Sequence, residues 1–322
     1  MRTPFCFTLT AALLLLLAAF PVRAQETQWH RVAVPVADLR KEPAPAGETL
    51  DHDPLEESQL LYGERVALLE KKSGWARVEA ADQLEWTRHG YWQGYPGWVK
   101  GEALLPADPS WVPNLLVTSK SATVHETPST RSSPLLILSL GSSLMGTSQV
   151  DGWWRLRLID GSTGWIASGD VTPLKELRRL RKEKEELRRR LVETARLFIG
   201  DPYYWGGRSA PRAGQTGPPH AAVDCSGLVG LVYQASGIGI PRDAHEQYLF
   251  SERISPEKLR PGDLIFLHDP HNEKRITHVM LFAGEGKIIE GPGTGMSVRE
   301  TDLESRLREA AGRRVSYGTY VK

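Results

Sequence analysis

The chain has 322 residues, of which 40% are hydrophobic and 25% are charged, and its formal net charge is +1. This composition is ordinary for a soluble globular protein and excludes a disordered, collagen-like or multi-span membrane chain. The small net charge provides no global field that would recruit a nucleic acid. Two cysteines are too few for a disulfide scaffold or a cysteine-rich zinc site. The length predicts two or three domains.

The N-terminal segment has the pattern of a secretory signal peptide, in which a positive start precedes an apolar run and a permissive cleavage position. Arg2 precedes the apolar run at 9–20, and Ala24 follows it. Because this run is shorter than the roughly 20 residues of a membrane span, we expect residues 1–24 to be cleaved rather than to form an anchor. The exported chain is expected in the periplasm or outside the cell, without stable membrane insertion, and with Cys225 as its one cysteine.

Two β-rich units follow, which we place at residues 25–108 and 109–172. Short runs of β-forming residues, such as 65–69 and 135–138, are separated by glycine, serine and proline. Units of this size with many short strands predict two small all-β barrels.

The two units are related by an internal repeat. Gly63 and Trp75 recur as Gly141 and Trp153, 78 positions later. The strings Ser-Gly-Trp-Ala-Arg-Val and Asp-Gly-Trp-Trp-Arg-Leu around these tryptophans, each followed by a second Gly-Trp pair, resemble the strands of bacterial SH3-type (SH3b) modules. We expect Trp75, Trp153 and Trp165 to belong to the barrel cores.

The first unit carries an aromatic insertion that the second lacks. It contains Trp86, Tyr91, Trp92 and Tyr95 on a polar, glycine-bearing stretch. Aromatic rings in such a loop suit a contact surface, because they offer a large area at low entropy cost. We interpret the loop as the wall of a neighbouring site, with local packing as the alternative.

Residues 173–199 have the leucine spacing of one helix, of which we assign 173–190 as a linker. The charge run at 178–190 is basic enough to suggest nucleic-acid binding. Its glutamates alternate with the arginines and lysines, which favours a solvated helix with i,i+4 ion pairs instead.

The segment at 220–236 contains the candidate nucleophile. Asp224 is placed to cap a helix whose first turn holds Cys225, and Gly237 is placed to end it. A cysteine in the first helical turn meets the positive end of the helix dipole, which favours the thiolate. The alternative is an inert buried cysteine.

A thiolate nucleophile needs a base, and the sequence offers one in a predicted hairpin. His278 lies near the start of a β run, and Glu290 lies on the returning strand, 12 positions later. We expect Glu290 to accept a hydrogen bond from one ring nitrogen of His278 while the other nitrogen faces Cys225. These three residues would then act as nucleophile, base and orienting group.

Four motifs in this half resemble the NlpC/P60 cysteine peptidases. They are Pro-Tyr-Tyr-Trp-Gly-Gly at 202–207, Asp-Cys-Ser-Gly at 224–227, Pro-Gly-Asp-Leu at 261–264 and Thr-His-Val at 277–279. The resemblance covers about residues 188–322 and implies an α+β papain-like domain, which we place at 191–322. It further implies hydrolysis of amide bonds in peptidoglycan stem peptides without a metal or organic cofactor.

Two SH3b units ahead of this domain, with Pro-Arg-Asp-Ala at 241–244, resemble the γ-D-glutamyl-L-diamino-acid endopeptidases (dipeptidyl-peptidase VI type). For this group the resemblance implies cleavage of stem peptides with a free N-terminal L-Ala, through a thioester on Cys225. Asp243 would pair with the ammonium, and Tyr95 would close the groove from the first SH3b unit. Further substrate contacts are implied for Tyr203, Asp224 and Ser226.

The chain departs from the family pattern at three places. The third catalytic residue is usually histidine and here is Glu290, a serine common in relatives is here Ala244, and residues 210–221 form an insertion. Two other functions therefore stay open. One is an endopeptidase of intact cell wall, with the SH3b units as wall anchors. The other, motivated by Glu290, is an inactive protein that binds muropeptides.

Overall fold

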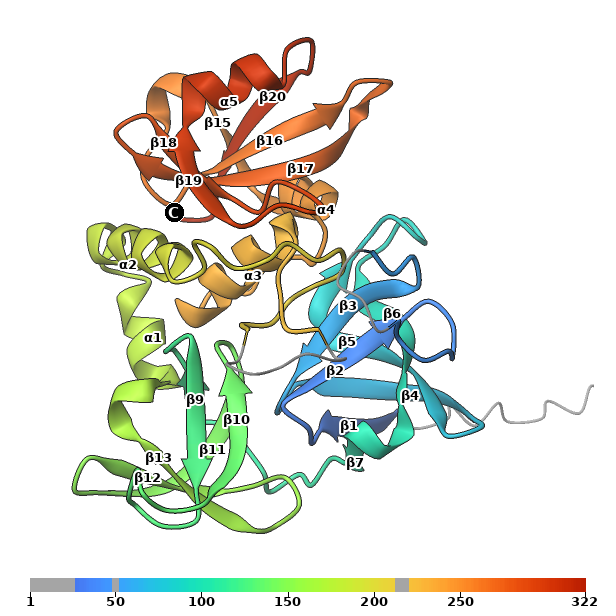
Figure 1. The fold of residues 1–322 in the computed structure, drawn as a ribbon, viewed down its shortest axis with the longest axis vertical. Coiled ribbons are helices and arrows are strands. Elements are labelled where there is room, and N and C mark those ends of the chain that lie inside the picture. The colour runs from blue at the N-terminus through green and yellow to red at the C-terminus, as the bar shows by residue number, and fades with distance from the viewer. Residues whose placement is uncertain (1–26, 48–51, 212–219) are drawn as a thin grey trace, which may run out of the picture.

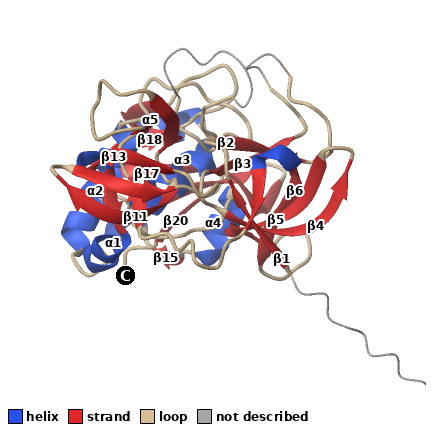
Figure 2. Ribbon diagram, turned by 90° about the horizontal axis from the view of Figure 1, so that it is seen from below, coloured by secondary structure: helices blue, strands red, loops and turns tan. Residues whose placement is uncertain are grey.

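The computed structural model describes residues 27–47, 52–211 and 220–322, so the predicted signal peptide at 1–24 and most of the insertion at 210–221 lie outside the described residues. Two all-β units are followed by an α+β domain, as predicted (Figure 1). The C-terminal sheet forms one layer, helices form a second, and the two β units lie side by side beneath them. In the orthogonal view, helices α3 and α4 lie at the centre, against the first β unit (Figure 2).

The first β unit is an antiparallel seven-stranded sheet in the order β3-β2-β6-β5-β4-β1-β7. Its strands are β1 (Gln28–Val32), β2 (Val36–Arg40), β3 (Glu56–Leu61), β4 (Arg65–Lys72), β5 (Trp75–Glu85), β6 (Gln93–Lys100) and β7 (Leu104–Pro106).

The second β unit repeats this topology in the order β10-β9-β13-β12-β11-β8-β14, so each strand takes the place of the strand seven numbers before it. Its strands are β8 (Leu115–Val117), β9 (Ser121–His125), β10 (Pro134–Ser139), β11 (Ser143–Val150), β12 (Trp153–Arg157), β13 (Thr163–Ala167) and β14 (Val171–Pro173). The sequence repeat is therefore a repeat of structure.

The prediction that Trp75, Trp153 and Trp165 fill the barrel cores is wrong. All three are half-buried and belong to none of the buried clusters. Side chains alternate between the two faces of a strand, and in β5 it is Ala76 and Val78 that face the core, which turns Trp75 outward. The tryptophan that is buried in a core is Trp111, at 2% exposure.

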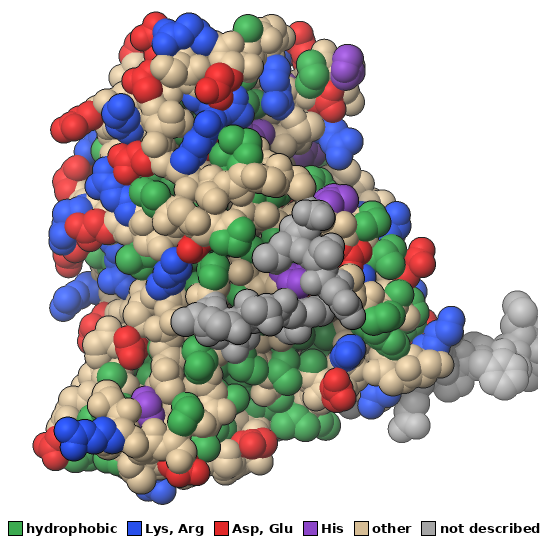
Figure 3. Space-filling model, viewed as in Figure 1, with side chains coloured by type: hydrophobic (Ala, Val, Ile, Leu, Met, Phe, Trp, Pro, Cys, Tyr) green, Lys and Arg blue, Asp and Glu red, His purple; other side chains and the backbone are tan. Residues whose placement is uncertain are grey.

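The predicted single helix at 173–199 is two helices, α1 (Leu174–Leu180) and α2 (Lys184–Arg196). Their outer surface has alternating charges, with Arg189 paired to Glu186 and Glu193, and Figure 3 shows interleaved basic and acidic side chains along that edge. The solvated interpretation of the charge run therefore agrees with the structure. The inner face of α2 buries Leu187 and Leu191 in the same core as α3.

The C-terminal domain packs helices against a six-stranded antiparallel sheet in the order β15-β20-β16-β17-β18-β19. Its elements are α3 (Cys225–Ala235), α4 (Ala244–Phe250), β15 (Glu252–Ile254), β16 (Leu264–Asp269), β17 (Asn272–Gly284), β18 (Lys287–Glu290), β19 (Arg299–Asp302), α5 (Leu303–Glu309) and β20 (Val315–Thr319). Leu228 and Leu231 of α3 pack with Val279 and Leu281 of β17 in the main core. Each such fully buried side chain contributes about 1.5–3 kcal/mol, which fixes α3 against β17.

Within the described part of the chain, no helix combines the length and the apolar character that a bilayer crossing requires.

Candidate active site

The candidate nucleophile lies at the start of α3. Asp224 caps this helix, because its Oδ1 accepts a hydrogen bond from Gly227 N at 2.6 Å. Cys225 is the first helical residue, as predicted, and 9% of its surface is exposed. The backbone amide of Val279 in β17 donates to its sulfur. Since Val279 follows His278, α3 and β17 bring the thiol and the base-bearing strand together.

The ionisation of Cys225 differs from the sequence-based expectation. Burial and then the charge of Asp224 raise the pKa of the thiol to about 12, although Val279 and Arg242 act to lower it. The expectation was wrong because it considered the helix dipole, worth about 0.3–1 kcal/mol, without the cost of burying a charge. A lone thiolate is unfavourable here, so removal of the thiol proton needs a base.

That base is placed by β17. His278 Nε2 lies 2.7 Å from Glu290 Oε2, so the predicted hydrogen bond is present. β17 and β18 are antiparallel with Leu281 opposite Ile289, and this register sets Glu290 on the same face as His278, one diagonal step away. Because Glu290 engages Nε2, Nδ1 is the ring nitrogen that remains available, and its predicted approach to Cys225 stays a prediction.

Glu290 is a buried carboxylate surrounded by cations. Its Oε1 accepts hydrogen bonds from Arg299 Nη2 at 2.8 Å and from Arg306 Nε at 2.9 Å. Burial alone would raise the pKa of Glu290, but His278, Arg299 and Arg306 outweigh it and hold the pKa at about 2. Glu290 therefore stays ionised at neutral pH, and its negative charge stabilises a protonated His278.

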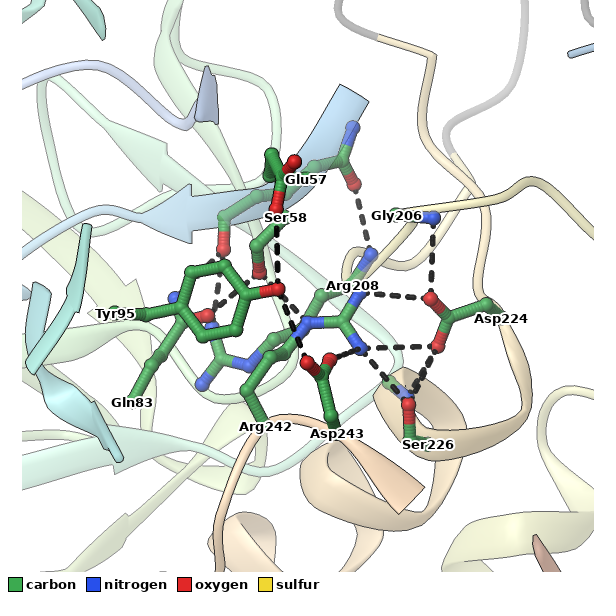
Figure 4. Close-up of polar contacts among 12 residues, drawn as sticks. Glu57, Ser58, Gln83, Tyr95, Gly206, Arg208, Asp224, Ser226, Arg242 and Asp243 are labelled. Carbon is green, nitrogen blue, oxygen red and sulfur yellow. Dashed lines mark hydrogen bonds and ion pairs between the residues drawn. The ribbon is translucent and has the colours of Figure 1, made fainter. Parts of the chain in front are cut away.

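Tyr95 and Asp243, each predicted to contact the substrate, meet across the boundary between the first β unit and the C-terminal domain. Tyr95 belongs to β6, and Asp243 is the N-cap residue of α4. The Tyr95 hydroxyl lies 3.1 Å from Asp243 Oδ2 and 3.3 Å from Glu57 Oε2 (Figure 4). Two carboxylates therefore face one phenol.

The carboxylate of Asp243 is accessible but poorly neutralised. Its side chain is 44% exposed, and the nearest basic atom with which it pairs, Arg242 Nη1, is 3.9 Å away. Burial of the site raises the pKa of Asp243 to about 7; Glu246 and Asp224 also raise it, and Arg242 and Tyr95 act against this shift. A positively charged ligand would relieve this unfavourable accumulation of negative charge.

Tyr203, Asp224 and Ser226, for which substrate contacts are implied, all lie around the nucleophile, and their role in binding stays a prediction. Burial and the proximity of Cys225 raise the pKa of Tyr203. Asp224 accepts hydrogen bonds from Gly206 N, Gly227 N, Ser226 Oγ and both terminal nitrogens of Arg242. Its carboxylate is fully used by the protein, because Arg242 and the helix cap hold it inward.

Sequence reasoning missed Arg242, Ser58 and Glu57. Arg242 is 3% exposed and bonds Asp224 on one side and Ser58 of β3 on the other. The motif at 241–244 indicated that Arg242 lies near the site. Nothing in β3 distinguishes Ser58 or Glu57 from ordinary strand residues, because their importance depends on a contact between domains.

The aromatic insertion lies between β5 and β6 and reaches α4. Trp86 contacts Trp92, and Trp92 contacts Phe250 with ring centroids 5.4 Å apart. Thr87 also donates to Glu246 from its amide and its hydroxyl. Both predicted alternatives hold in part: the loop packs locally and also borders α4, which begins after Asp243.

His220 and His268, which lie outside the His278–Glu290 pair, form hydrogen bonds within the protein. His220 Nε2 lies 3.1 Å from the Gly47 carbonyl, and His268 Nε2 lies 2.8 Å from Ser316 Oγ. Among the residues for which coordinates are described, no three His, Cys, Asp or Glu side chains are grouped to hold a metal ion.

A cavity of about 410 Å³ lies behind α3, at the junction of all three domains. Its lining includes Ser226, Gln83 and Arg242 but not Cys225 or His278. Cys225 and His278 therefore do not border this cavity, although Ser226, the residue after Cys225, does.

Comparison with known proteins agrees with this geometry. The model of the NlpC/P60 family matches residues 200–312. The chain is 29% identical over 264 residues to the γ-D-glutamyl-L-lysine dipeptidyl-peptidase of Bacillus cereus, covering 80% of this chain and 74% of that protein. It is 25% identical over 254 residues to the enzyme of the same name from Bacillus subtilis, covering 79% and 78%.

A solved structure has the same fold. The crystal structure of an NlpC/P60 family protein from Bacillus cereus superposes with a TM-score of 0.74 at 23% identity, covering 91% of this chain and 100% of that one. Residues 200–312 are therefore a domain of the NlpC/P60 cysteine peptidase family, and the two all-β units that precede it fit the SH3b type.

Proposed function

We propose that this peptidase hydrolyses the bond between γ-D-glutamate and the diamino acid in peptidoglycan stem peptides that bear a free N-terminal L-Ala. The observation that carries the proposal is the pairing of Tyr95 with Asp243, which joins the first β unit to the catalytic domain at 3.1 Å. The relatives named γ-D-glutamyl-L-lysine dipeptidyl-peptidases act at a bond of this class and support it.

The charges near Asp243 favour an ammonium group. Asp243, Glu57 and Glu246 gather at this end of the site, and Glu57 forms an ion pair with Arg88, whose side chain is 39% exposed. A free α-amine would neutralise Asp243, and it is small enough to lie close to the Tyr95 ring. We expect Tyr95 and the aromatic insertion to block a longer peptide beyond that amine, which would account for removal of a dipeptide.

The proposed reaction is acyl transfer to the sulfur of Cys225. His278 Nδ1 takes the thiol proton as the sulfur attacks the carbonyl carbon of the γ-carboxamide, and the amide of Cys225 at the start of α3 donates to the developing oxyanion. His278 then gives the proton to the leaving amine, so that the diamino-acid peptide departs and a thioester remains. Water, deprotonated by His278, attacks the thioester carbonyl; the carbon–sulfur bond breaks, L-Ala-γ-D-Glu leaves, and the sulfur of Cys225 takes the proton back from His278.

Mass spectrometry of the products tests the proposal. The protein is incubated with L-Ala-γ-D-Glu-L-Lys and, in parallel, with its N-acetylated form. We expect L-Ala-γ-D-Glu and free lysine from the first peptide, and a kcat/KM at least about 100-fold lower for the second, because the acetyl group removes the charge and adds bulk. Equal rates for the two peptides, or release of peptides from intact sacculi without prior amidase treatment, would contradict the requirement for a free amine and favour a wall hydrolase.

The pKa of Asp243 predicts the pH dependence of KM. Asp243 carries its charge above about pH 7, whereas an α-amino group loses its charge above about pH 8. KM is therefore expected to be lowest between these values and to rise by about tenfold per pH unit below pH 7, as Asp243 becomes protonated. Steady-state kinetics from pH 5 to 9 measure this. In Asp243→Asn the acidic rise should disappear and KM should be high throughout; an unchanged profile in that variant would rule out Asp243 as the amine partner.

We also propose that residues 1–24 direct the protein to the periplasm or the cell exterior, where stem peptides occur. Detection of the mature N-terminus at Gln25 in an exported fraction tests this assignment.

A further inference from the structure

A chain of buried hydrogen bonds runs from the first β unit to the cap of the nucleophile helix. Ser58 Oγ donates to Gln83 Oε1 at 2.6 Å, and Arg242 Nε donates to Ser58 Oγ at 2.7 Å. Arg242 Nη2 and Nη1 then donate to the two oxygens of Asp224, at 2.8 and 3.1 Å (Figure 4). Asp224 is followed directly by Cys225.

Every member of this chain is removed from solvent. Ser58 is 0% exposed, Gln83 2%, Arg242 3% and Asp224 7%. Burial alone would lower the pKa of Arg242, but Asp224 and Asp243 raise it well above its usual range, so the guanidinium stays charged. A charge buried in this way is sensitive to its partners, because water does not replace a missing one.

The direction of each hydrogen bond is fixed by the neighbouring bonds. Gln83 Nε2 donates to the Gln59 carbonyl at 2.9 Å and to Glu64 Oε2 at 3.0 Å, which leaves Gln83 Oε1 as the group that faces Ser58. The one hydroxyl proton of Ser58 is used on that oxygen, so its lone pairs face Arg242 Nε. Ser58 is therefore held as an acceptor for Arg242, and the β unit sets the orientation of the guanidinium.

The orientation of Arg242 affects the nucleophile. The charge of Asp224 raises the pKa of Cys225 and the charge of Arg242 lowers it. The net effect of these two charges on Cys225 depends on Arg242 keeping its bidentate contact with Asp224. If the guanidinium tilts away, Asp224 acts on Cys225 without compensation, and the thiol gives up its proton to His278 less readily.

We propose that Ser58, on the first β unit, is a positioning residue for the peptidase reaction: it holds Arg242 against Asp224, the residue that caps the nucleophile helix immediately before Cys225. The inference rests on Cys225 as the nucleophile, and it assigns the SH3b-type unit a part in catalysis besides its contact with the substrate amine.

The test compares Ser58→Ala with Ser142→Ala in the full chain. Ser142 is a matched control, since it is also 0% exposed and its hydroxyl has no hydrogen-bond partner among the described residues. The rate of alkylation by iodoacetamide is followed from pH 5 to 10 by mass spectrometry of the peptide that contains Cys225. This readout needs no substrate, so it gives an answer even if the proposed stem peptide is not cleaved.

In Ser58→Ala we expect the alkylation profile to move to higher pH by about one unit, and kcat to fall about tenfold with KM nearly unchanged. Ser142→Ala should leave both unchanged. A Ser58→Ala profile that superposes on that of the unaltered protein, with only a lower melting temperature, would overturn the proposal. If Ser58→Ala does not fold, Gln83→Ala removes the acceptor of the Ser58 proton and should shift the profile in the same direction, and an unshifted profile there overturns the proposal equally.

Discussion

Replacing Cys225 by alanine is expected to lower kcat for L-Ala-γ-D-Glu-L-Lys by at least about 10⁴-fold, because the sulfur is the atom that forms the acyl bond and no other group occupies its place. Quantification of released lysine by mass spectrometry measures this loss. Binding should survive, since Asp243 and Tyr95 are untouched and the thiol contributes little to ground-state affinity. Calorimetric titration of the variant with the same peptide measures that binding.

His278→Ala provides the matched control for this experiment. It leaves the sulfur in place but removes the group that takes its proton, so kcat should fall by a similar factor, and the double variant should be no slower than either single variant. Activity that survives in Cys225→Ala would mean that another residue carries the reaction. If the unaltered protein binds the peptide without ever turning it over, the chain would be a muropeptide-binding protein.

The fold was predictable where short-range sequence signals decide it. The recurrence of Gly63 and Trp75 as Gly141 and Trp153 predicted two like units, and their strand orders are the same. The cap residue Asp224 predicted where α3 begins, since a side chain that can accept a hydrogen bond, followed by an apolar helical face, is typical of a helix N-terminus. These signals are local, so they do not depend on how the domains meet.

The misses depend on which face of an element meets another. The direction of Trp75 follows from the register of β5, in which Ala76 and Val78 face the core. Leucine spacing alone predicted one continuous helix over 173–199, but the helix breaks after Leu180, and α2 buries Leu187 and Leu191 in the core of the C-terminal domain. The spacing of apolar residues indicates which face of a helix is buried, but it does not indicate where along the helix the surface that covers this face ends.

The sequence predicted which groups make up the candidate site, but it did not predict their burial or the residues that surround them. His278 and Glu290 are brought together by one hairpin, so their spacing in the sequence was informative. The pKa of Cys225 depends on burial, and the role of Ser58 depends on a bond to Arg242 that is 184 positions away. Long-range contacts of this kind leave no pattern in a single sequence.

Glu290→Gln is expected to lower kcat by about 10²-fold while Cys225 and His278 stay in place. The amide oxygen of glutamine can still accept a hydrogen bond from His278 Nε2, so the ring keeps its orientation. The negative charge that stabilises the imidazolium is lost, and the transition state in which His278 holds the proton becomes less favourable. Steady-state kinetics on the stem peptide measure the loss, and a variant with unchanged kcat would show that His278 needs no anionic partner.

The same substitution should change how stability depends on pH. The pKa of Glu290 is about 2 in the folded chain against a usual 4.5, so its stabilising effect is complete above about pH 4.5 and is lost as the pH falls toward 2. The shift corresponds to about 3 kcal/mol of unfolding free energy. Denaturant unfolding at pH 2.5 to 6 should therefore show a difference in unfolding free energy between the unaltered protein and Glu290→Gln that is largest near pH 6 and shrinks on acidification.

Glu304→Gln is the control, because Glu304 pairs with Arg308 at the surface, where ion pairs contribute about 0–1 kcal/mol. A difference that stays constant across the whole range would mean that Glu290 stabilises the domain by packing and not by its charge.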